Sequence, residues 1–434
     1  MLRFARSWMA PSKAYQLATL ARQGVGVLVA ILFAKGPLSA AAIGQYEQLL
    51  YVGTLLSAFW VTGLVQALLA RYARLSEAGQ LSFVWTAYLV VAGLGFALSL
   101  LAWWARAWWV PAVSGRASLA HLGLFLSYLA VQLPVFLTDN YYLLWERGNR
   151  LLVYGLLSYG LQLPFLLVPV WLGYGLEGAL WGLLFIAVSR HLWLLGELVR
   201  HSNPRWDLQL ARHWMAAAGP LVLYALVGVL SVSFDSWLVN WQYGGDPQQF
   251  AIFRYGAREF PLVVALAAAF SSAMLPALSA NKEEGARALR RRSLRLYHLL
   301  FPLCIALVLS SHWWFPKLFN SAFAASAPIF DVFILTTVSR LVFARTVLIA
   351  LQENRMVFYL SVVELAFNII LGFALVKAFG LLGVAWATVA AYTLEKTMLA
   401  AYLYRKHRIS PAAYTPLNWL AVYSLLLLFS VIMQ

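Results

Sequence analysis

Seven basic residues lie inside long apolar segments of the sequence, where a charge is costly and usually serves a function. They are Arg22, Arg190, Arg254, Arg258, Arg340, Arg345 and Lys396. A guanidinium stays protonated at any physiological pH and offers a planar fork of donors to phosphate oxygens. Arg254 and Arg258 are four residues apart and therefore share a helical face. The pattern favours an anionic substrate, with Arg258, Arg340, Arg254, Arg345 and Arg22 as the candidate binding residues.

Acidic residues in the same segments permit a second interpretation. They are Glu47, Asp139, Asp235, Glu259, Glu364 and Glu395. Buried carboxylates can exchange H+ or Na+ with a substrate or couple transport to an ion gradient. We expect Asp235, Glu364, Glu259 and Glu47 as the candidates for such coupling. Alternatively these acids neutralise the arginines, as the neighbours Glu259–Arg258 and Glu395–Lys396 suggest. Basic residues outnumber unpaired acids in the second half of the chain, which favours an anionic substrate.

Catalytic and metal-binding patterns are not found in the sequence. The single cysteine, Cys304, lies in an apolar run, and the histidines show no metal-ligand spacing. A Walker-type glycine loop is absent, so any work must come from an ion gradient, the membrane potential or the substrate's own gradient. We therefore expect no enzyme, no catalytic residue, no metal site and no cofactor beyond H+ or Na+.

The composition explains why the charges matter. Hydrophobic residues make up 62% of the 434, charged residues 11%, and the mean hydropathy is +0.75. Apolar runs long enough to span a bilayer recur along the chain. We predict spans at 14–35, 46–70, 81–104, 119–142, 150–172, 176–200, 213–239, 249–278, 294–312, 328–350, 355–377, 382–404 and 416–433. The chain is therefore predicted to be a polytopic all-α membrane protein.

The distribution of basic residues predicts the orientation of the chain. With the N-terminus inside, 20 of the 32 lysines and arginines lie in cytoplasmic segments, 5 in outer segments and 7 in spans. This bias follows the positive-inside rule, so the net charge of +16 reflects topology rather than nucleic-acid binding. The densest run, Lys282 to Arg295, is expected in a cytoplasmic loop. It serves either as a topological anchor or as a contact for anionic lipids.

An internal repeat organises the predicted spans. Trp108–Pro111 (WWVP) returns 205 positions later as Trp313–Pro316 (WWFP), and Gly175–Trp181 returns as Gly380–Trp386. Each copy holds six spans, so both copies insert with the same orientation. We predict a six-helix lobe at 1–205, a second at 206–415 and an extra helix at 416–434. The tryptophans fit the membrane interface, and the glycines fit tight turns and close helix packing.

Three kinds of short motif, taken together with their order along the chain, resemble those of the polysaccharide-type, Wzx-like flippases. Gly175–Trp181 and Gly380–Trp386 are similar to that family's glycine turns, Leu275–Ser279 (LPALS) to its Leu-Pro-x-Leu-Ser stretch, and Gly44–Tyr46 to its Gly-x-Tyr. The resemblance covers residues 14 to about 404. It implies the fold of the multidrug-extrusion (MATE), oligosaccharidyl-lipid and lipid II exporters, with two lobes around a central cavity. It departs in span number, because we count thirteen where twelve or fourteen are usual.

The resemblance also implies a function. The expected protein is a flippase that carries a polyprenyl-diphosphate-linked oligosaccharide, such as an O-antigen unit, to the outer leaflet by alternating access through a cationic cavity. A MATE-like drug or cation antiporter and a lipid II flippase are the alternatives. A membrane glycosyltransferase is disfavoured by the short outer loops. We expect the bacterial inner membrane, contacts with membrane lipids and with polymerase or ligase machinery, no nucleic-acid partner, and a functional monomer.

Overall fold

The computed structural model describes residues 9–434, and every regular element within that range is helical. Ten helices are long and apolar enough to cross a membrane, and two of these, at 148–201 and 354–407, are 54 residues long and turn back on themselves. A polytopic all-α membrane protein is confirmed. Each of the two long elements consists of two arms, and each arm corresponds to one predicted span.

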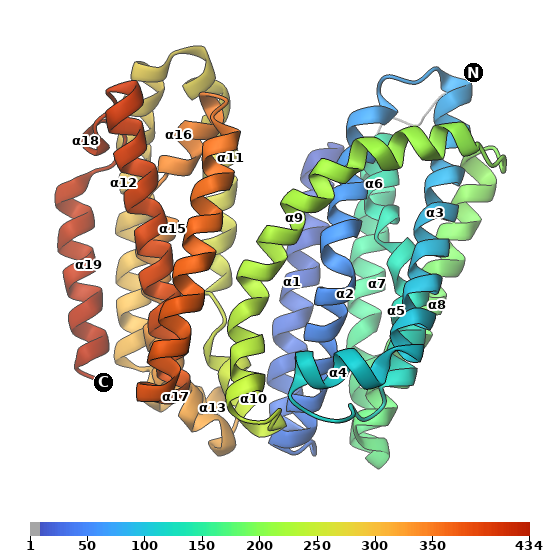
Figure 1. Cartoon of the computed structure of the whole chain (residues 1–434), viewed down its shortest axis with the longest axis horizontal. Coiled ribbons are helices and arrows are strands. Elements are labelled where there is room, and N and C mark those ends of the chain that lie inside the picture. The colour runs from blue at the N-terminus through green and yellow to red at the C-terminus, as the bar shows by residue number, and fades with distance from the viewer. Residues whose placement is uncertain (1–8) are drawn as a thin grey trace. The chain divides into compact units, whose positions relative to one another are not determined.

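The helices of the first half of the chain are α1 (Pro11–Lys35), α2 (Ala40–Tyr72), α3 (Glu77–Trp104), α4 (Arg106–Ser114), α5 (Leu122–Val135), α6 (Leu137–Leu144), α7 (Gly148–Pro169), η1 (Val170–Tyr174), α8 (Gly175–His201) and α9 (Leu208–Gln242). Those of the second half are α10 (Pro247–Gly256), α11 (Pro261–Ala280), α12 (Lys282–Leu309), α13 (Ser311–Leu318), η2 (Ser321–Ser326), α14 (Ala327–Phe333), α15 (Thr336–Arg340), α16 (Ala344–Ala350), α17 (Asn354–His407), α18 (Pro411–Tyr414) and α19 (Leu417–Ile432). Figure 1 labels most of them.

The repeated glycines form the turns inside the two long elements. Gly175 and Gly380 have φ of 58° and 59°, a left-handed backbone that only glycine adopts without cost. The next repeated glycine permits close packing of the two arms. A Cβ on Gly383 would lie 2.0 Å from the carbonyl oxygen of Leu375, and one on Gly178 would lie 2.6 Å from the Cβ of Tyr174. These positions explain the repeated sequence block as scaffold.

The chain divides into two compact units, which are described separately. The first unit contains the residues up to Ser233 and also Gly244–Gln248. In it α1 packs along α7, and α5 lies between α3 and α8. One buried cluster joins α2, α3, α6, α8 and the start of α9, and in it the fully buried Trp214 meets Phe83 edge-on at 5.5 Å.

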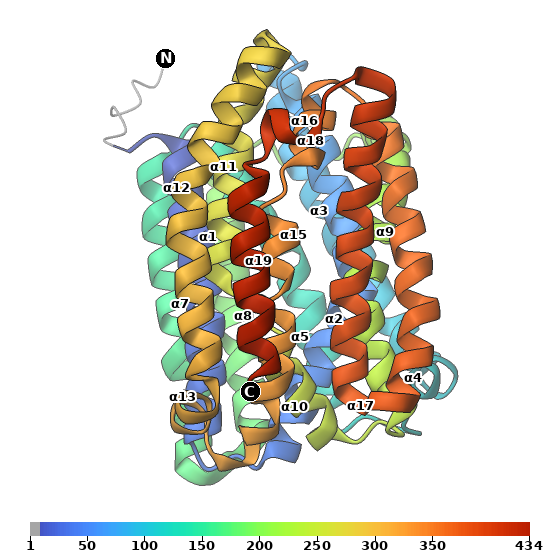
Figure 2. The ribbon, with the colours of Figure 1, turned by 90° about the vertical axis from the view of Figure 1, so that its left-hand side faces the viewer.

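The second unit contains Phe234–Tyr243 and Gln249–Gln434. Here α12 packs against both α11 and α19, and Figure 2 shows α19 running beside α12. The rings of Phe301 and Tyr423 stack at 5.1 Å, and the Tyr423 hydroxyl bonds His298 at 2.8 Å. The last predicted span, 416–433, is therefore the helix α19, held to this unit by an aromatic contact.

Three predicted spans are interrupted. The first unit breaks its fourth span at Phe136, between α5 and α6. In the second unit, the predicted span 249–278 is broken at 257–260, and the predicted span 328–350 is broken at 334–335 and 341–343. Interrupted helices expose backbone groups that must find partners within the protein, and such interruptions often accompany binding sites in transporters.

The basic run Lys282–Arg295, expected in a cytoplasmic loop, is helical and forms the first half of α12, while its cytoplasmic location remains a prediction. The helix begins there because the Asn281 side chain accepts hydrogen bonds from the backbone N–H groups of Glu283 and Glu284. Both acids also lie in the first turn, where they complement the helix dipole. The capped helix therefore accommodates the closely spaced arginines.

Candidate functional site

The two interruptions of the second unit are joined by an ion pair. Arg340 ends α15, and Glu259 lies in the break between α10 and α11. The Arg340 Nε donates to one carboxylate oxygen of Glu259 at 2.7 Å and Nη2 to the other at 2.6 Å. The Arg340 side chain is 37% exposed, and its guanidinium lies 5.4 Å from the Tyr392 ring. This bidentate geometry is the one in which a guanidinium binds carboxylate or phosphate.

A second charged group in the same unit is centred on Glu395. Lys396 Nζ donates to the Glu395 carboxylate at 2.8 Å, and Arg345 Nη2 lies 3.5 Å from it. Arg345 also donates to the Ser361 hydroxyl at 2.7 Å. In the structure Arg340 and Arg345 are thus paired with acids, as the alternative interpretation of the sequence expected. Each of the two side chains is nevertheless more than a third exposed.

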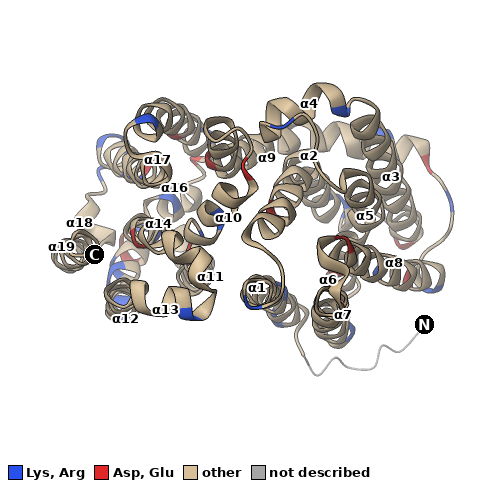
Figure 3. Cartoon of the chain, turned by 90° about the horizontal axis from the view of Figure 1, so that it is seen from below, with Lys and Arg blue, Asp and Glu red and all other residues tan. Residues whose placement is uncertain are grey.

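The remaining predicted arginines are placed differently. Arg258 lies in the same break as Glu259, with its guanidinium 5.0 Å from the Tyr255 ring. Arg254 lies one turn earlier, in the last turn of α10. Arg22 projects from α1 of the first unit and is exposed. The substrate-binding roles of Arg258, Arg340, Arg254, Arg345 and Arg22 remain predictions, but all of them except Arg22 occupy interruptions or flank them. Figure 3 shows the charged segments on the helices of each unit.

Asp235, predicted for ion coupling, belongs to a buried polar site. It is 7% exposed and accepts hydrogen bonds from Asn368 Nδ2 at 3.1 Å and from the Thr388 hydroxyl at 2.6 Å. Glu364, one helical turn before Asn368, is 5% exposed. Neither Glu364 Oε1 nor Asn368 Oδ1 has a hydrogen-bond partner among the described residues.

These oxygens form a donor set that suits a small hard cation. Carboxylate, amide and hydroxyl oxygens are the ligands of such ions, and two unpartnered oxygens beside a buried carboxylate are the expected signature of a binding position. The repeat does not preserve the set. Subtracting 205 from Asp235, Asn368 and Thr388 gives Ala30, Leu163 and Leu183, which are apolar.

The other two predicted coupling residues do not join this site. Glu259 is engaged by Arg340. Glu47 is 3% exposed and lies near the start of α2 in the first unit. Their roles in ion coupling remain predictions. Asn368 and Thr388 were missed because neutral polar residues are unremarkable in a membrane helix. The available signal was the position of Asn368 one helical turn after Glu364.

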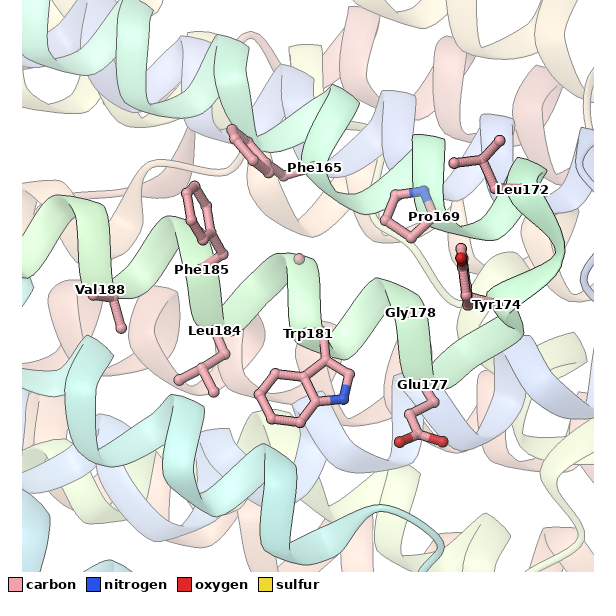
Figure 4. Close-up of a pocket in the computed structure, with 11 residues that line it drawn as sticks. Phe165, Pro169, Leu172, Tyr174, Glu177, Gly178, Trp181, Leu184, Phe185 and Val188 are labelled. Atoms are coloured by element: carbon pink, nitrogen blue, oxygen red, sulfur yellow. The ribbon is translucent and has the colours of Figure 1, made fainter.

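Two apolar grooves lie outside these sites. One, of about 800 Å³, runs between α7 and α8 of the first unit, with Glu177 the single charged residue of its lining. Figure 4 shows Phe165 and Phe185 facing each other across it, with ring centroids 4.7 Å apart, and Trp181 beside Glu177. The other, of about 470 Å³, lies in the second unit beside Lys396 and Tyr414. Neither offers converging polar groups that would fix a ligand.

The sequence matches the family model described as Lipid II flippase MurJ over residues 170–434. Among solved structures, one titled "Lipid II flippase MurJ, inward closed conformation" has a TM-score of 0.75 at 16% identity, covering 96% of this chain and 91% of that chain. An inward-facing multidrug resistance MATE family transporter of the MOP superfamily has a TM-score of 0.65 at 16% identity, covering 92% and 95%. A MOP superfamily transporter from Pyrococcus furiosus has a TM-score of 0.62 at 17% identity, covering 94% and 97%.

No curated protein sequence matches the chain significantly. The structural likenesses confirm the predicted MATE-like fold. The match to the family model identifies the chain as a membrane transporter rather than an enzyme. The expected resemblance holds at the level of that fold. Its narrower form, the Wzx-like group, is replaced by the match to the lipid II flippase model.

Proposed function

The chain belongs to the lipid II flippase MurJ family, and from this premise we propose that it translocates lipid II, a polyprenyl-diphosphate-linked saccharide, across a bacterial inner membrane. The O-antigen unit predicted from the sequence carries the same diphosphate. We now prefer lipid II as the cargo, because the family match favours that alternative. The family model leaves residues 1–169 unmatched. A different sugar on the same polyprenyl diphosphate is therefore retained as the second candidate.

One observation carries the proposal: the bidentate pair of Arg340 and Glu259 between two interrupted spans. Glu259 occupies both donors of the Arg340 fork, and this bidentate contact supports the proposal because phosphate oxygens can bind the same donors. A diphosphate oxygen pair meets the same geometry and brings greater charge. We propose that the diphosphate displaces Glu259 from Arg340 and that the neighbouring Arg258 supplies a second cation. Glu259 then serves as the counter-ion of the empty state.

The site of Asp235, Asn368 and Thr388 supports ion coupling as part of this function. A bound H+ or Na+ would neutralise one of the two buried carboxylates, Asp235 or Glu364, and so reduce the cost of burying two negative charges in one unit. We propose that H+ or Na+ binds there, and that its occupancy biases the alternating-access cycle. Membrane lipids and polymerase or ligase machinery are the proposed partners, and the N-terminus is proposed to be cytoplasmic.

Reconstituted protein tests the proposed cargo directly. Proteoliposomes would be loaded with labelled lipid II, with a polyprenyl-diphosphate oligosaccharide of different sugar, or with an organic cation in separate preparations. We expect protein-dependent appearance of lipid II in the opposite leaflet, scored by a membrane-impermeant modifying reagent.

The three cargoes separate the candidates. Faster movement of the second glycolipid than of lipid II would move the assignment to the surface-polysaccharide cargo. Efflux of the organic cation with neither glycolipid moved would contradict the proposal in favour of a drug antiporter. Liposomes without protein set the background of spontaneous lipid movement.

A further inference from the structure

The interior of the first unit contains a group of buried polar side chains that the proposed function does not use. Arg190 and Gln132 are each 6% exposed and Ser158 is 7% exposed. Among the described residues, Arg190 Nε, Gln132 Oε1, Ser158 Oγ and Asp139 Oδ1 have no hydrogen-bond partner. Buried polar atoms are nearly always satisfied, by protein groups or by ordered water. All four atoms belong to the first unit, and each requires water or another group as its partner.

Asp139 is the carboxylate of this site. It lies in the first turn of α6, directly after the interruption at Phe136. Its Oδ2 accepts a long hydrogen bond of 3.4 Å from the Tyr159 hydroxyl, and it makes no ion pair among the described residues. A buried carboxylate with so little support is costly when ionised, so either nearby cations or a bound proton must stabilise it.

Arg190 approaches the same place from α8. Its Nη2 donates to the Ser158 carbonyl and to Gln162 Oε1, both at 2.8 Å, which fixes the guanidinium in position. The guanidinium lies 4.8 Å from the ring of Tyr159, whose hydroxyl faces Asp139. Tyr159 thus lies between the cation and the carboxylate, and the unpartnered Nε of Arg190 is left for water.

The groups that act on Asp139 come from several packed helices. Arg22 of α1, Arg190 of α8, and Tyr154 and Tyr159 of α7 interact with it electrostatically. From α5, which packs against α8, comes the neutral Gln132. The charged residues of α2, Glu47 and Arg71, lie near the two ends of that helix. Asp139 is therefore balanced between burial, which opposes its charge, and two arginines, which favour it.

We infer that Asp139 is a proton-binding carboxyl, loaded and unloaded through water held against Arg190, Gln132 and Ser158. In the ionised state, Asp139 is supported by Arg190 across Tyr159, which contacts both residues, and water serves the free Nε of Arg190. In the protonated state, Asp139 Oδ1–H donates to water, and the unpartnered Gln132 Oε1 and Ser158 Oγ of the same unit can accept from that water. The donor group therefore stabilises the ionised state of Asp139, and the acceptor groups stabilise its protonated state. A proton moves from water to Oδ1 and back, with no other bond made or broken.

This site is distinct from the ion site of the second unit. Adding 205 to Asp139, Gln132 and Arg190 gives Ala344, Thr337 and Glu395, so the repeat does not carry it. Its position beside the α5–α6 interruption places the protonation step next to a break in a membrane helix. A proton bound here would act in addition to the H+ or Na+ proposed at Asp235.

Infrared difference spectroscopy of the full-length protein in lipid nanodiscs tests the inference without any substrate, so its outcome is independent of the proposed cargo. We expect a protonated-carboxyl stretching band that disappears reversibly as pH rises and that is missing in Asp139→Asn. The exposed Asp246→Asn is the matched control and should retain the band. Arg190→Gln should shift the midpoint of this band to higher pH, because removing the guanidinium destabilises the carboxylate.

A second variant keeps the test decisive if Asp139→Asn fails to fold. Asp139→Glu retains the carboxyl and should titrate with an altered midpoint. An unchanged band in Asp139→Asn, or the same midpoint in wild type and Arg190→Gln, would overturn the inference and leave the cluster as hydrated packing.

Discussion

The two units of the protein share their turns but not their charges. At equivalent repeat positions, Gly175 and Gly380 have the same left-handed backbone, with φ of 58° and 59°. Arg190 of the first unit is replaced by Glu395 in the second, and Asn140 by Arg345. At these two positions the first unit has a base and a neutral amide, whereas the second has the acid and the base of the Glu395 ion-paired group. Duplication has preserved the scaffold, and the sites have diverged within it.

The ends of the helices show the same divergence. In the first unit, Glu197 on α8 accepts from Arg150 at 2.8 Å, with His201 at 3.5 Å. In the second unit the acid is on the turn instead, where Glu353 pairs with Lys406 and His407 of α17. Both arrangements tie the turn before one arm to the end of the next, with the charges exchanged. An ion pair that only holds two segments together keeps its role when the acid and the base exchange places, whereas a site that binds a charged ligand does not.

The largest effect is expected where the two arms of each long element pack most closely, a feature that both units share. Gly383 is repeated as Gly178, whereas the counterpart of Gly182 is Ala387. A Cβ on Gly383 would lie 2.0 Å from Leu375 O, and one on Gly182 would lie 1.8 Å from Phe165 O. Because backbone atoms cannot yield as a flexible side chain does, Gly383→Ala and Gly182→Ala should each cost at least about 1–3 kcal/mol and abolish insertion or yield. Gly160→Ala, with nothing within 4 Å, is the control. Normal yield of both variants in detergent extracts would disprove the shared-scaffold account.

The next effect should appear in the second unit alone. Asn368→Leu removes a donor to Asp235 and should cost about 1–3 kcal/mol of stability, because a buried carboxylate oxygen loses its partner. It should also remove any dependence of transport on the H+ or Na+ gradient. Leu163 is the equivalent residue of the first unit, so Leu163→Asn should leave ion dependence intact. Transport measured in proteoliposomes under imposed gradients checks both, and equal loss in the two variants would contradict the difference between the units.

A smaller effect is expected when Arg345 is converted to the first unit's residue. Arg345→Asn leaves Glu395 paired with Lys396 but removes one charge-assisted hydrogen bond, worth about 1.5–3 kcal/mol. If Arg345 contributes to substrate binding, the KM for the lipid-linked cargo should rise roughly tenfold with a smaller change in kcat. Ser361→Ala removes the same hydrogen bond without the charge and separates packing from electrostatics. An unchanged KM would assign Arg345 to structure alone.

The smallest effect concerns the exposed tie at Glu353. The hydrogen bond from Lys406 holds the pKa of Glu353 below its usual value of 4.5. This pair therefore contributes stability above the unfolded pKa, and the contribution is lost as pH falls through the lower folded pKa. Thermal unfolding should show a slight difference between wild type and Glu353→Gln at neutral pH that vanishes in acid below about 4. A difference that grows in acid would contradict the sign.

The sequence predicted the repeat, the membrane class and the pairing of neighbours such as Glu395 and Lys396, because periodicity and adjacency are local properties. It did not predict the break at 257–260, since the apolar run continues on both sides. Pro261, the first residue of α11, was the local signal of a new helix. The partners of Asp235 come from 133 and 153 residues away, and such distant contacts arise from packing that no local pattern specifies.

The central claim, that arginines in the interrupted spans of the second unit bind the diphosphate, is tested most directly by measuring lipid II movement in proteoliposomes for Arg258→Ala/Arg340→Ala. The control is Arg106→Ala/Arg116→Ala, which removes the same charge from outside the predicted spans. We expect the first double variant to lose movement almost completely while inserting normally, and the control to retain it. Movement at the wild-type rate in the first double variant would contradict the claim.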